Sequence, residues 1–229
     1  MWENTAAAFA AAHAAGAEFI ETDCRVTADG DVVLFHDETL QRLLGDPRPV
    51  DEVRTFELAE LLAPHGGLQT VSDALTGFPE IRFNIDVKTD AAVDPIGPAV
   101  APHAHRVLLT SFSDARRRRS VDSVVAAGAA MRPATSAGRS TIIALRLLSM
   151  VRLSPARVLR DVDAVQIPER QGPIHLFTPS LVRAAQRAGV EVHVWTVNDP
   201  DDMRRLVAAG ADGIVTDRAD IAVKALSLT

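Results

Sequence analysis

One pattern of hydrophobic and polar positions recurs along the chain: an alanine-rich helical stretch, a glycine, and then a short apolar strand. It occurs as AHAAGAEFIETD (12–23), VVAAGAAMRPA (124–134), AQRAGVEVHVWTV (185–197) and LVAAGADGIVTD (206–217). The glycine of each unit stands where a helix would end in a left-handed C-cap. Further apolar strands lie between these units, each followed by a helix-compatible segment. Strands that alternate with helices predict a parallel sheet with right-handed crossovers.

The spacing of these units predicts a barrel. We expect strands at about 17–23, 81–87, 106–111, 129–133, 163–168, 190–196 and 212–216, whereas a closed (β/α) barrel needs eight. The chain opens directly in a helix, with Asn4 or Thr5 as its N-cap, so the missing strand would precede Met1. A doubly wound sheet is the alternative, but no glycine-rich dinucleotide turn follows an early strand. We therefore predict an α/β, TIM-type (β/α) barrel of a single domain, residues 1–229, with seven of eight strands visible and the first strand missing.

Composition narrows the class of protein only slightly. The net charge of −6, from 30 acidic and 24 basic residues, argues against a general nucleic-acid binder. A single cysteine, Cys24, excludes an internal disulfide framework and suits a reducing compartment. No apolar run is long enough for a transmembrane segment, and the N-terminus has no signal-peptide pattern. We predict a cytoplasmic location, and the sequence does not indicate an oligomeric state.

The densest group of acidic and histidine side chains lies in EFIETDCRVTADGDVVLFHD (18–37), which predicts a strand, a turn and a second extended piece. Because alternate residues of a strand share a face, Glu21 and Asp23 point the same way, and His36 follows on the second piece. Two carboxylates at the end of a buried strand need a cation between them or solvent around them. Barrel enzymes place their catalytic groups at the C-terminal ends of strands, so we favour a site.

The next predicted strand carries a second polar group. Asn84, Asp86 and Lys88 share one face of FNIDVK by the same period of two. Neighbouring strands lie about 4.8 Å apart, so Asp86 can complete a three-carboxylate cluster with Glu21 and Asp23. Oxygen donors of this kind suit Mg²⁺ or Ca²⁺ rather than zinc. Lys88 would face the same site as a cation for an anionic substrate; a salt bridge that neutralises the carboxylates is an equally good interpretation of its position.

Six segments of the chain carry a family resemblance: WENTAAAF (2–9), FIETDCRVTADGDVVLFHDETLQR (19–42), FNIDVK (83–88), TSF (110–112), VWTVND (194–199) and GADGIVTD (210–217). Together, and in this order, they resemble the glycerophosphodiester phosphodiesterase family. The resemblance implies a TIM-type barrel that hydrolyses a small-molecule phosphodiester, a glycerophosphodiester, to glycerol 3-phosphate and an alcohol. It also implies a divalent metal and two histidines.

The resemblance assigns roles to the residues of the acidic cluster. Glu21 and Asp23 match the family's metal-binding carboxylates, and Asp86 stands where most members have glutamate. His36, in HDETL, matches the second catalytic histidine, which protonates the leaving group. The family opens with a strand ending in His-Arg-Gly, which supplies the other acid/base and a phosphate-binding arginine, and this chain begins after that point. We expect a fragment or a misassigned start, with very low turnover for the chain as given; a non-catalytic barrel that binds a phosphorylated ligand or a metal is the alternative.

Three further residues are candidates for the site. Trp195, at a strand end, would wall the alcohol pocket, as the resemblance suggests, or pack as part of the rim. Ser111 ends a strand on the active face and is the second candidate for substrate binding. Glu3 would lie behind the metal ligands, or simply near a helix N-terminus whose dipole favours an acidic residue.

Two basic stretches have other interpretations. Arg116–Arg119 form a short run that is typical of a solvated helix face. The segment RSTIIALRLLSMVRLSPARVLR (139–160) mixes basic and apolar residues at helical spacing. It could lie on a membrane surface, but a barrel helix needs the same amphipathic stripe, and we favour the barrel helix.

Overall fold

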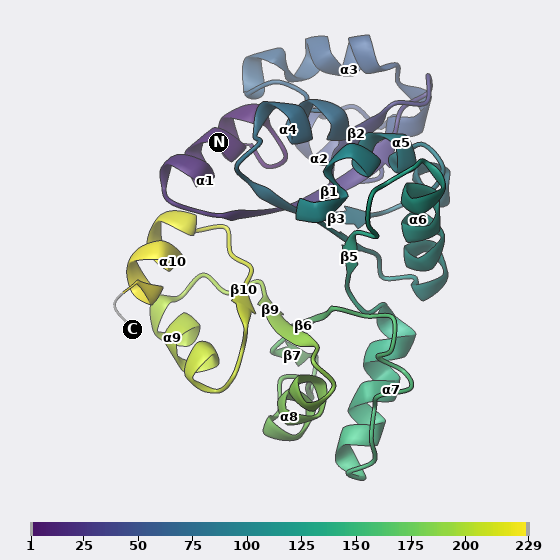
Figure 1. The fold of residues 1–229 in the computed structure, drawn as a ribbon. Helices are drawn as coiled ribbons and strands as arrows, with labels where there is room; N and C mark the ends of the chain where they lie inside the picture. Colours follow the sequence, from purple (N-terminus) through teal and green to yellow (C-terminus); the bar gives the residue numbers. More distant parts are fainter. Residues whose placement is uncertain (1, 228–229) are drawn as a thin grey trace. The chain divides into compact units, whose positions relative to one another are not determined.

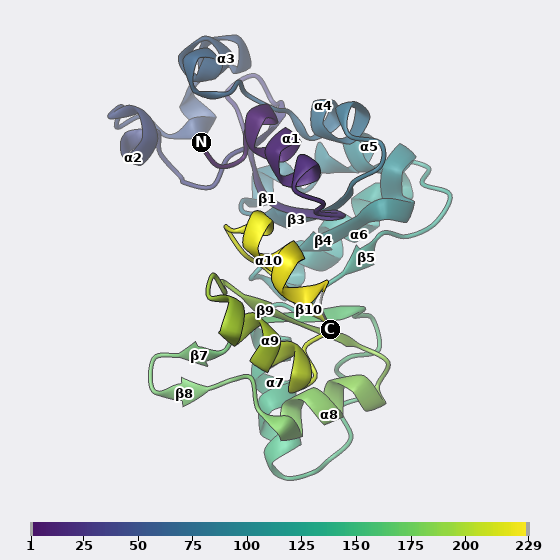
Figure 2. The same ribbon diagram turned by 90° about the vertical axis from the view of Figure 1, so that its left-hand side faces the viewer.

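The computed structural model describes residues 2–227, which fall into two compact units (Figures 1 and 2). The first unit comprises Met1–Ser111 and Ala115–Pro133, and the second comprises Phe112–Asp114 and Ala134–Thr229. Each unit alternates strands with helices, as the sequence pattern predicts. Among the described residues, no helix is long and apolar enough to cross a membrane.

The first unit is built on a sheet in the order β2-β1-β3-β4. Its strands are β1 (Phe19–Val26), β2 (Val32–Leu34), β3 (Arg82–Val87) and β4 (Val107–Thr110). Strands β1, β3 and β4 run parallel, and β2 returns antiparallel to β1. Its helices are α1 (Ala6–Ala14), α2 (Gln41–Leu44), α3 (Thr55–Leu62), α4 (Val71–Gly77), α5 (Ile96–Val100) and, apart from its first residue, α6 (Asp114–Ala126). Short 3₁₀ segments cover Val50–Glu52, Ala63–His65, Asp90–Ala92 and Ala101–Arg106.

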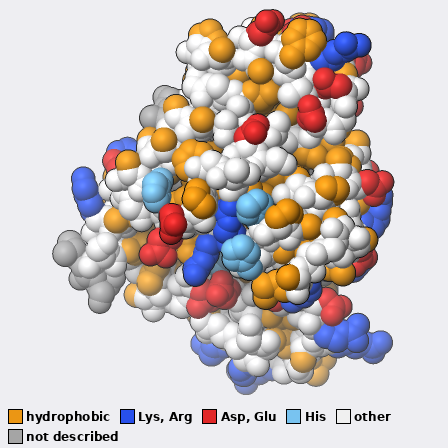
Figure 3. All heavy atoms as spheres, turned by 45° about the horizontal axis from the view of Figure 1, so that its top comes forward, with side chains coloured by type: hydrophobic (Ala, Val, Ile, Leu, Met, Phe, Trp, Pro, Cys, Tyr) orange, Lys and Arg blue, Asp and Glu red, His pale blue; other side chains and the backbone are white. Residues whose placement is uncertain are grey.

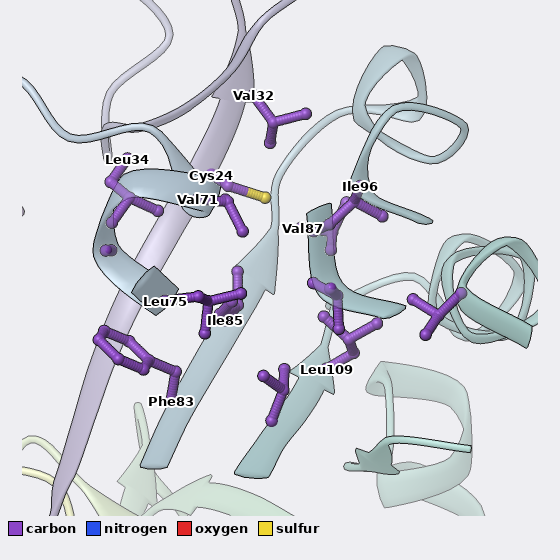
Figure 4. Packing of buried hydrophobic residues seen from close by; sticks show 14 of the residues in the cluster. Cys24, Val32, Leu34, Val71, Leu75, Phe83, Ile85, Val87, Ile96 and Leu109 are labelled. Carbon is purple, nitrogen blue, oxygen red and sulfur yellow. The ribbon is translucent and has the colours of Figure 1, made fainter. Parts of the chain in front are cut away.

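The two faces of this sheet differ sharply in polarity. Phe83, Ile85 and Val87 of β3 and Leu109 of β4 are at most 2% exposed and pack with residues of α4 and α5 in one hydrophobic cluster (Figure 4). The alternate residues point to the opposite face, which therefore carries the polar side chains of these strands. Cys24 lies on the apolar face, fully buried, and burial together with nearby carboxylates raises the pKa of its thiol, so it is an inert core residue.

The second unit holds a sheet in the order β10-β9-β6 and a two-stranded hairpin, β7-β8. Its strands are β5 (Ala134–Thr135), β6 (Ala164–Pro168), β7 (Arg170–Gln171), β8 (Ile174–His175), β9 (Glu191–Trp195) and β10 (Gly213–Ile214). Its helices are α7 (Arg139–Met150), α8 (Pro179–Arg187), α9 (Pro200–Ala208) and α10 (Ala219–Leu226). Strands β6, β9 and β10 are parallel, and Ser136, just after β5, makes a parallel bridge to Ala164.

Most of the predicted elements are confirmed in residues 2–227. Six of the seven predicted strands overlap β1, β3, β4, β6, β9 and β10, the four glycines of the recurring unit all have positive φ, and Thr5 is the N-cap of α1. The strand predicted at 129–133 is wrong. Pro133 has no N–H for a sheet ladder and restricts the residue before it, so the extended piece begins only at Ala134.

Helix α7 begins without a side-chain cap of its own, and Asp114 takes over that function. Its carboxylate accepts hydrogen bonds from the backbone N–H groups of Gly138 (3.0 Å) and Thr141 (3.1 Å), and from the hydroxyls of Ser140 and Thr141. Burial alone would raise the pKa of Asp114, but these donors outweigh burial and hold it below its usual range. Asp114 therefore ties the chain before α6 to the start of α7.

We expect Asp114→Asn to lower the free energy of unfolding by about 1.5–3 kcal/mol at pH 7, because an amide cannot accept all of these bonds and leaves a buried donor unpaired. The folded-state pKa is depressed, so the stabilisation is present above about pH 4 and is lost as the pH falls from there towards that lower pKa. Urea unfolding at pH 7 and at about pH 3 should show the difference between wild type and variant shrinking at acid pH. Asp122→Asn, on the exposed face of α6, is the control; a pH-independent difference would contradict the ionic cap.

Candidate active site

The register of β1 and β3 decides which carboxylates meet. Asp23 lies directly opposite Asp86, whereas Glu21 lies opposite Asn84. All four residues belong to the polar face, because neighbouring residues of the same strands, Ile20 and Ile85, are buried in the core. Asp23 and Asp86 are thus adjacent near the carboxyl ends of two parallel strands.

Lys88 joins this carboxylate pair. Its Nζ lies 2.7 Å from Oδ1 of Asp23 and 2.6 Å from Oδ2 of Asp86, and all three side chains are largely buried. Burial raises the pKa of Asp86, and Lys88 opposes that shift. Burial alone would lower the pKa of Lys88, but Asp86 and Asp23 outweigh it and keep that pKa above its usual value. Lys88 is therefore ionised and acts as the cation between the two carboxylates.

The predicted three-carboxylate cluster is not assembled in the described part of the chain. Residues 2–227 contain no group of three or more His, Cys, Asp or Glu side chains arranged to hold a metal ion. The physical reason is the register, which places Glu21 beside Asn84 instead of beside Asp86, and the ammonium group of Lys88, which occupies the space between Asp23 and Asp86. The assignment of Glu21, Asp23 and Asp86 to a metal stays a prediction.

The residues present nevertheless fit a divalent cation. Oδ1 of Asp86 is buried and has no hydrogen-bond partner among residues 2–227, so this oxygen is an acceptor without a donor. Hard cations such as Mg²⁺ and Ca²⁺ take carboxylate oxygens of this kind. Asp23 and Asp86 would hold such a cation, and Glu21, which is exposed two residues before Asp23, extends the same face.

Asn4, rather than Glu3, contacts the carboxylate pair. The Asn4 side chain donates to Oδ2 of Asp23 (3.3 Å) and accepts from the hydroxyl of Thr22 (2.7 Å). Asn4 has a positive φ of 56°, which aims its amide at β1. In the sequence, Asn4 is predicted only as a possible helix cap. Its position immediately before Thr5, the actual cap, is the local signal for its contact with β1.

His36 is part of a chain of polar contacts that ends at Glu3. Its Nδ1 lies 2.6 Å from Oδ1 of Asp37, whose Oδ2 accepts from Nε of Arg42 at 2.5 Å. Arg42 also pairs with Glu3. The hydrogen bond from Arg42 is the main cause that holds the pKa of Asp37 below its usual range. Glu3 is therefore linked to His36 through Arg42, and its predicted place behind the metal ligands stays a prediction.

This series of polar contacts sets the orientation of the His36 imidazole. Because Asp37 is ionised, it favours a proton on Nδ1 of His36 and leaves Nε2 as the outward-facing nitrogen. The His36 side chain is 53% exposed, so Nε2 can reach a ligand. Nε of Arg25 also donates to the backbone carbonyl of His36 (3.0 Å), which holds the segment between β2 and α2 against β1.

Ser111, just after β4, and Arg116, on α6, both contact the end of β3. The Ser111 hydroxyl donates to the carbonyl of Val87 (2.8 Å), a backbone contact that links the ends of two strands; its role in substrate binding stays a prediction. Arg116 pairs with Asp90 at 2.6 Å and is a cation near Asp86. The interpretation of Arg116–Arg119 as a solvated face is wrong for its first half: Arg117 is 3% exposed and Arg116 is largely buried.

Trp195 ends β9 in the second unit, as expected for a strand-end aromatic. Its ring meets Phe112 edge-on, with ring centroids 6.2 Å apart and planes at 78°. Its part in an alcohol pocket stays a prediction.

On the face drawn in Figure 3, acidic and basic side chains are interspersed, without a broad area of one sign.

Comparisons with known proteins identify the family of the chain. The glycerophosphoryl diester phosphodiesterase family matches residues 1–221. A probable glycerophosphodiester phosphodiesterase 2 of Mycobacterium tuberculosis is 39% identical over 224 residues, which cover 95% of this chain and 83% of that protein.

Solved structures show the fold. The glycerophosphodiester phosphodiesterase of Thermotoga maritima has a TM-score of 0.76 at 24% identity and covers 98% of this chain and 92% of that one. A phosphodiesterase of Oleispira antarctica, solved with its product sn-glycerol-3-phosphate, has a TM-score of 0.71 at 16% identity, with 97% and 90% covered.

The fold is therefore α/β, of the TIM-barrel class, as predicted. With the match to nearly its whole length, the chain belongs to the glycerophosphoryl diester phosphodiesterase family, a family of phosphoric diester hydrolases. The description of the chain as a single domain stays a prediction.

Proposed function

We propose that this protein hydrolyses glycerophosphodiesters to glycerol 3-phosphate and an alcohol, with Mg²⁺ or Ca²⁺ held by Asp23, Asp86 and Glu21. The observation that carries the proposal is the juxtaposition of Asp23 and Asp86 at the ends of adjacent parallel strands, with a buried, unused oxygen on Asp86. Family membership supports the choice of substrate. The single buried cysteine suits a reducing compartment, and the proposal includes a cytoplasmic location.

When bound, the cation would neutralise charge on the phosphodiester oxygens and stabilise the charge that builds up in the transition state. Lys88 has two partners of opposite charge, Asp23 and Asp86. When these carboxylates hold the cation, its ammonium group would bind a phosphodiester oxygen. Arg116 provides a second cation on the same side of β3. Both residues favour an anionic substrate over a neutral one.

His36 supplies the proton to the departing alkoxide. Asp37 holds Nδ1, so the transferable proton resides on Nε2 of the imidazolium. Arg42 and Glu3 keep Asp37 in place. A positioned acid matters most for an alkyl alcohol, because an alkoxide is a poor leaving group.

The test is the release of glycerol 3-phosphate from sn-glycero-3-phosphocholine, measured with a coupled dehydrogenase in EDTA and with Mg²⁺, Ca²⁺ or Zn²⁺ added. We expect product only with a divalent cation, at the very low turnover predicted for the chain as given, and a loss of about tenfold or more in Asp23→Asn and Asp86→Asn, because each removes a charged ligand. Glu60→Gln, an exposed acidic residue of α3, is the matched control.

Calorimetric titration with glycerol 3-phosphate separates the two functional classes. Metal-dependent binding without product would favour the non-catalytic barrel. Absence of both binding and product with every metal, or full activity of Asp23→Asn and Asp86→Asn, would contradict the proposal.

A further inference from the structure

We propose that α7 and the turn after it form a docking surface for a membrane rich in anionic phospholipid. The surface consists of five exposed apolar side chains, Ile143, Leu147, Met150, Val151 and Leu153, with arginines around them. We call it the α7 surface. The inference goes beyond the proposed function and does not depend on it.

The apolar stripe of the α7 surface is not the face with which α7 packs. Leu145 and Ser149 are buried and face the second unit's core, where α7 also packs against α8 (Figure 2). Successive residues of a helix turn by about 100°, so Ile143, Leu147 and Met150 lie on the side opposite to that buried face. They are 54%, 59% and 61% exposed. The helix therefore has an apolar face beyond the one that a barrel helix needs.

The apolar stripe continues past the end of the helix. Val151 is 64% exposed and Leu153 is 60% exposed, and between them Arg152 has a positive φ of 57°. Five large apolar side chains within eleven residues are unusual on the surface of a protein, and such contiguous patches mark interaction sites.

Charge indicates the kind of partner. Residues 139–160 contain five arginines and no acidic residue, in a chain whose net charge is −6. Helix α8 adds Arg183 and Arg187, again without an acidic residue. An amphipathic helix with apolar and arginine side chains on its surface binds at the interface of anionic bilayers, where each basic residue near the surface adds to the attraction.

Three arginines of this region, unlike several other arginines of the chain, have no carboxylate partner among the described residues. Arg42, Arg48 and Arg205 are all engaged in close ion pairs with acidic residues. By contrast, Arg152, Arg183 and Arg187 have no carboxylate within ion-pair distance in the part of the chain that the structure describes, residues 2–227. Their charge is available to an external anion.

A cavity of about 550 Å³ lies beside the apolar stripe, between the turn after α7 and helix α8. Its polar lining consists of three arginines and three serines: Arg152, Arg183, Arg187, Ser149, Ser154 and Ser180. Guanidinium and hydroxyl groups are the donors that a phosphate prefers. The cavity would receive the phosphate of a lipid headgroup while Leu153, which also lines it, enters the apolar layer.

A second copy of the chain is a poorer occupant of the α7 surface. Two-fold dimers bring the same patch of both subunits together. Such an interface would set the arginines of α7 and α8 against one another without an acidic residue from these helices to compensate them. An anionic bilayer satisfies both the apolar stripe and the charge.

Vesicle flotation of the full chain tests the proposal. We expect the protein to float with phosphatidylcholine vesicles that contain about one third phosphatidylglycerol, and not with phosphatidylcholine alone, and we expect release at high salt. The apolar triple variant I143S/L147S/M150S and the arginine triple variant R152Q/R183Q/R187Q should each weaken binding on the order of tenfold or more.

Matched controls change the same residue types elsewhere. F56S/M131S/I174S removes three exposed apolar side chains, and R54Q/R118Q/R170Q removes three exposed arginines with the same change in net charge. Both should bind like wild type. Because a triple variant can fail to fold, the single variant Leu147→Trp provides a second measurement, and its fluorescence should shift to the blue only with anionic vesicles.

Several outcomes would overturn the proposal. These are no flotation with anionic vesicles together with no shift in Leu147→Trp, an equal loss in the control variants, and binding of inorganic phosphate alone that R152Q/R183Q/R187Q abolishes without any vesicle binding. A concentration-dependent dimer that is lost in I143S/L147S/M150S, without vesicle binding, would assign the surface to a second copy instead.

Discussion

His36→Ala is expected to lower kcat for an alkyl glycerophosphodiester by about 10²–10⁴-fold, because the variant lacks the acid that protonates the leaving alkoxide. The affinity for Mg²⁺ or Ca²⁺ should remain, since within residues 2–227 the His36 side chain makes no hydrogen bond or ion pair with Asp23 or Asp86. Steady-state kinetics with glycerophosphocholine and a calorimetric metal titration measure the two quantities separately.

The choice of leaving group distinguishes an acid from a merely structural residue. A p-nitrophenyl ester departs without protonation, so the variant should lose much less activity on glycerol 3-phosphate p-nitrophenyl ester than on glycerophosphocholine. His13→Ala, on the exposed side of α1, is the matched control and should behave like wild type on both substrates. Equal losses on both esters would contradict the role of His36 as the acid, and retained activity on glycerophosphocholine would remove it from the site.

Much of the fold could be predicted because its signals are local. A glycine that ends a helix and a run of apolar residues that begins a strand lie within a few positions of one another, so β1, β9 and β10 could be located from the chain alone. The strand predicted at 129–133 is not formed, although the apolar pattern favours it. Pro133 has no N–H to donate to a sheet, so the extended piece begins only at Ala134.

The candidate site, too, could be predicted only where its signals are local. The period of two places Asp23, Asp86 and Lys88 on one face without any tertiary information. The register does not follow from that period: it sets Asp23, and not Glu21, opposite Asp86. The chain from His36 through Asp37 and Arg42 to Glu3 spans 39 residues at its last step, and no local pattern indicates it.

For the arginine run after β4, the composition led to a wrong prediction. Four consecutive basic residues have the composition of a solvated surface, yet helix α6 turns Arg117 into the protein and Arg116 towards Asp90. A helix presents consecutive residues to different surroundings, so composition alone cannot describe such a run.

Lys88→Met is expected to lower the free energy of unfolding by about 3–5 kcal/mol at pH 7 in EDTA, because it removes the cation from a buried ionic group and leaves two adjacent carboxylates. Asp23 and Asp86 are 10% and 7% exposed at their side chains, so water screens their repulsion poorly. Urea unfolding followed by circular dichroism measures the change. Lys88→Arg, which keeps the charge, is the control and should lose much less stability.

The pH dependence of Lys88→Met has a definite sign. Burial already raises the pKa of Asp86, and Lys88 is the main influence that lowers it, so the variant should raise it further. A carboxyl whose folded pKa lies above its unfolded value stabilises the protein only below that unfolded value, near pH 4, and loses this contribution as the pH rises through the folded pKa. The deficit of the variant should therefore narrow as the pH is lowered from 7 towards 4.

Calcium separates the structural role of Lys88 from the metal-binding role of its partners. In the wild type a divalent cation must displace the ammonium group from Asp23 and Asp86, whereas in Lys88→Met it meets two uncompensated carboxylates. Saturating Ca²⁺ should consequently stabilise the variant more than the wild type, because ligand binding to the folded state adds to its stability. Wild-type stability of Lys88→Met in EDTA at pH 7 would contradict the bridging role of Lys88. A destabilised variant that gains nothing from Ca²⁺ or Mg²⁺ would leave the bridge intact and remove the metal from Asp23 and Asp86.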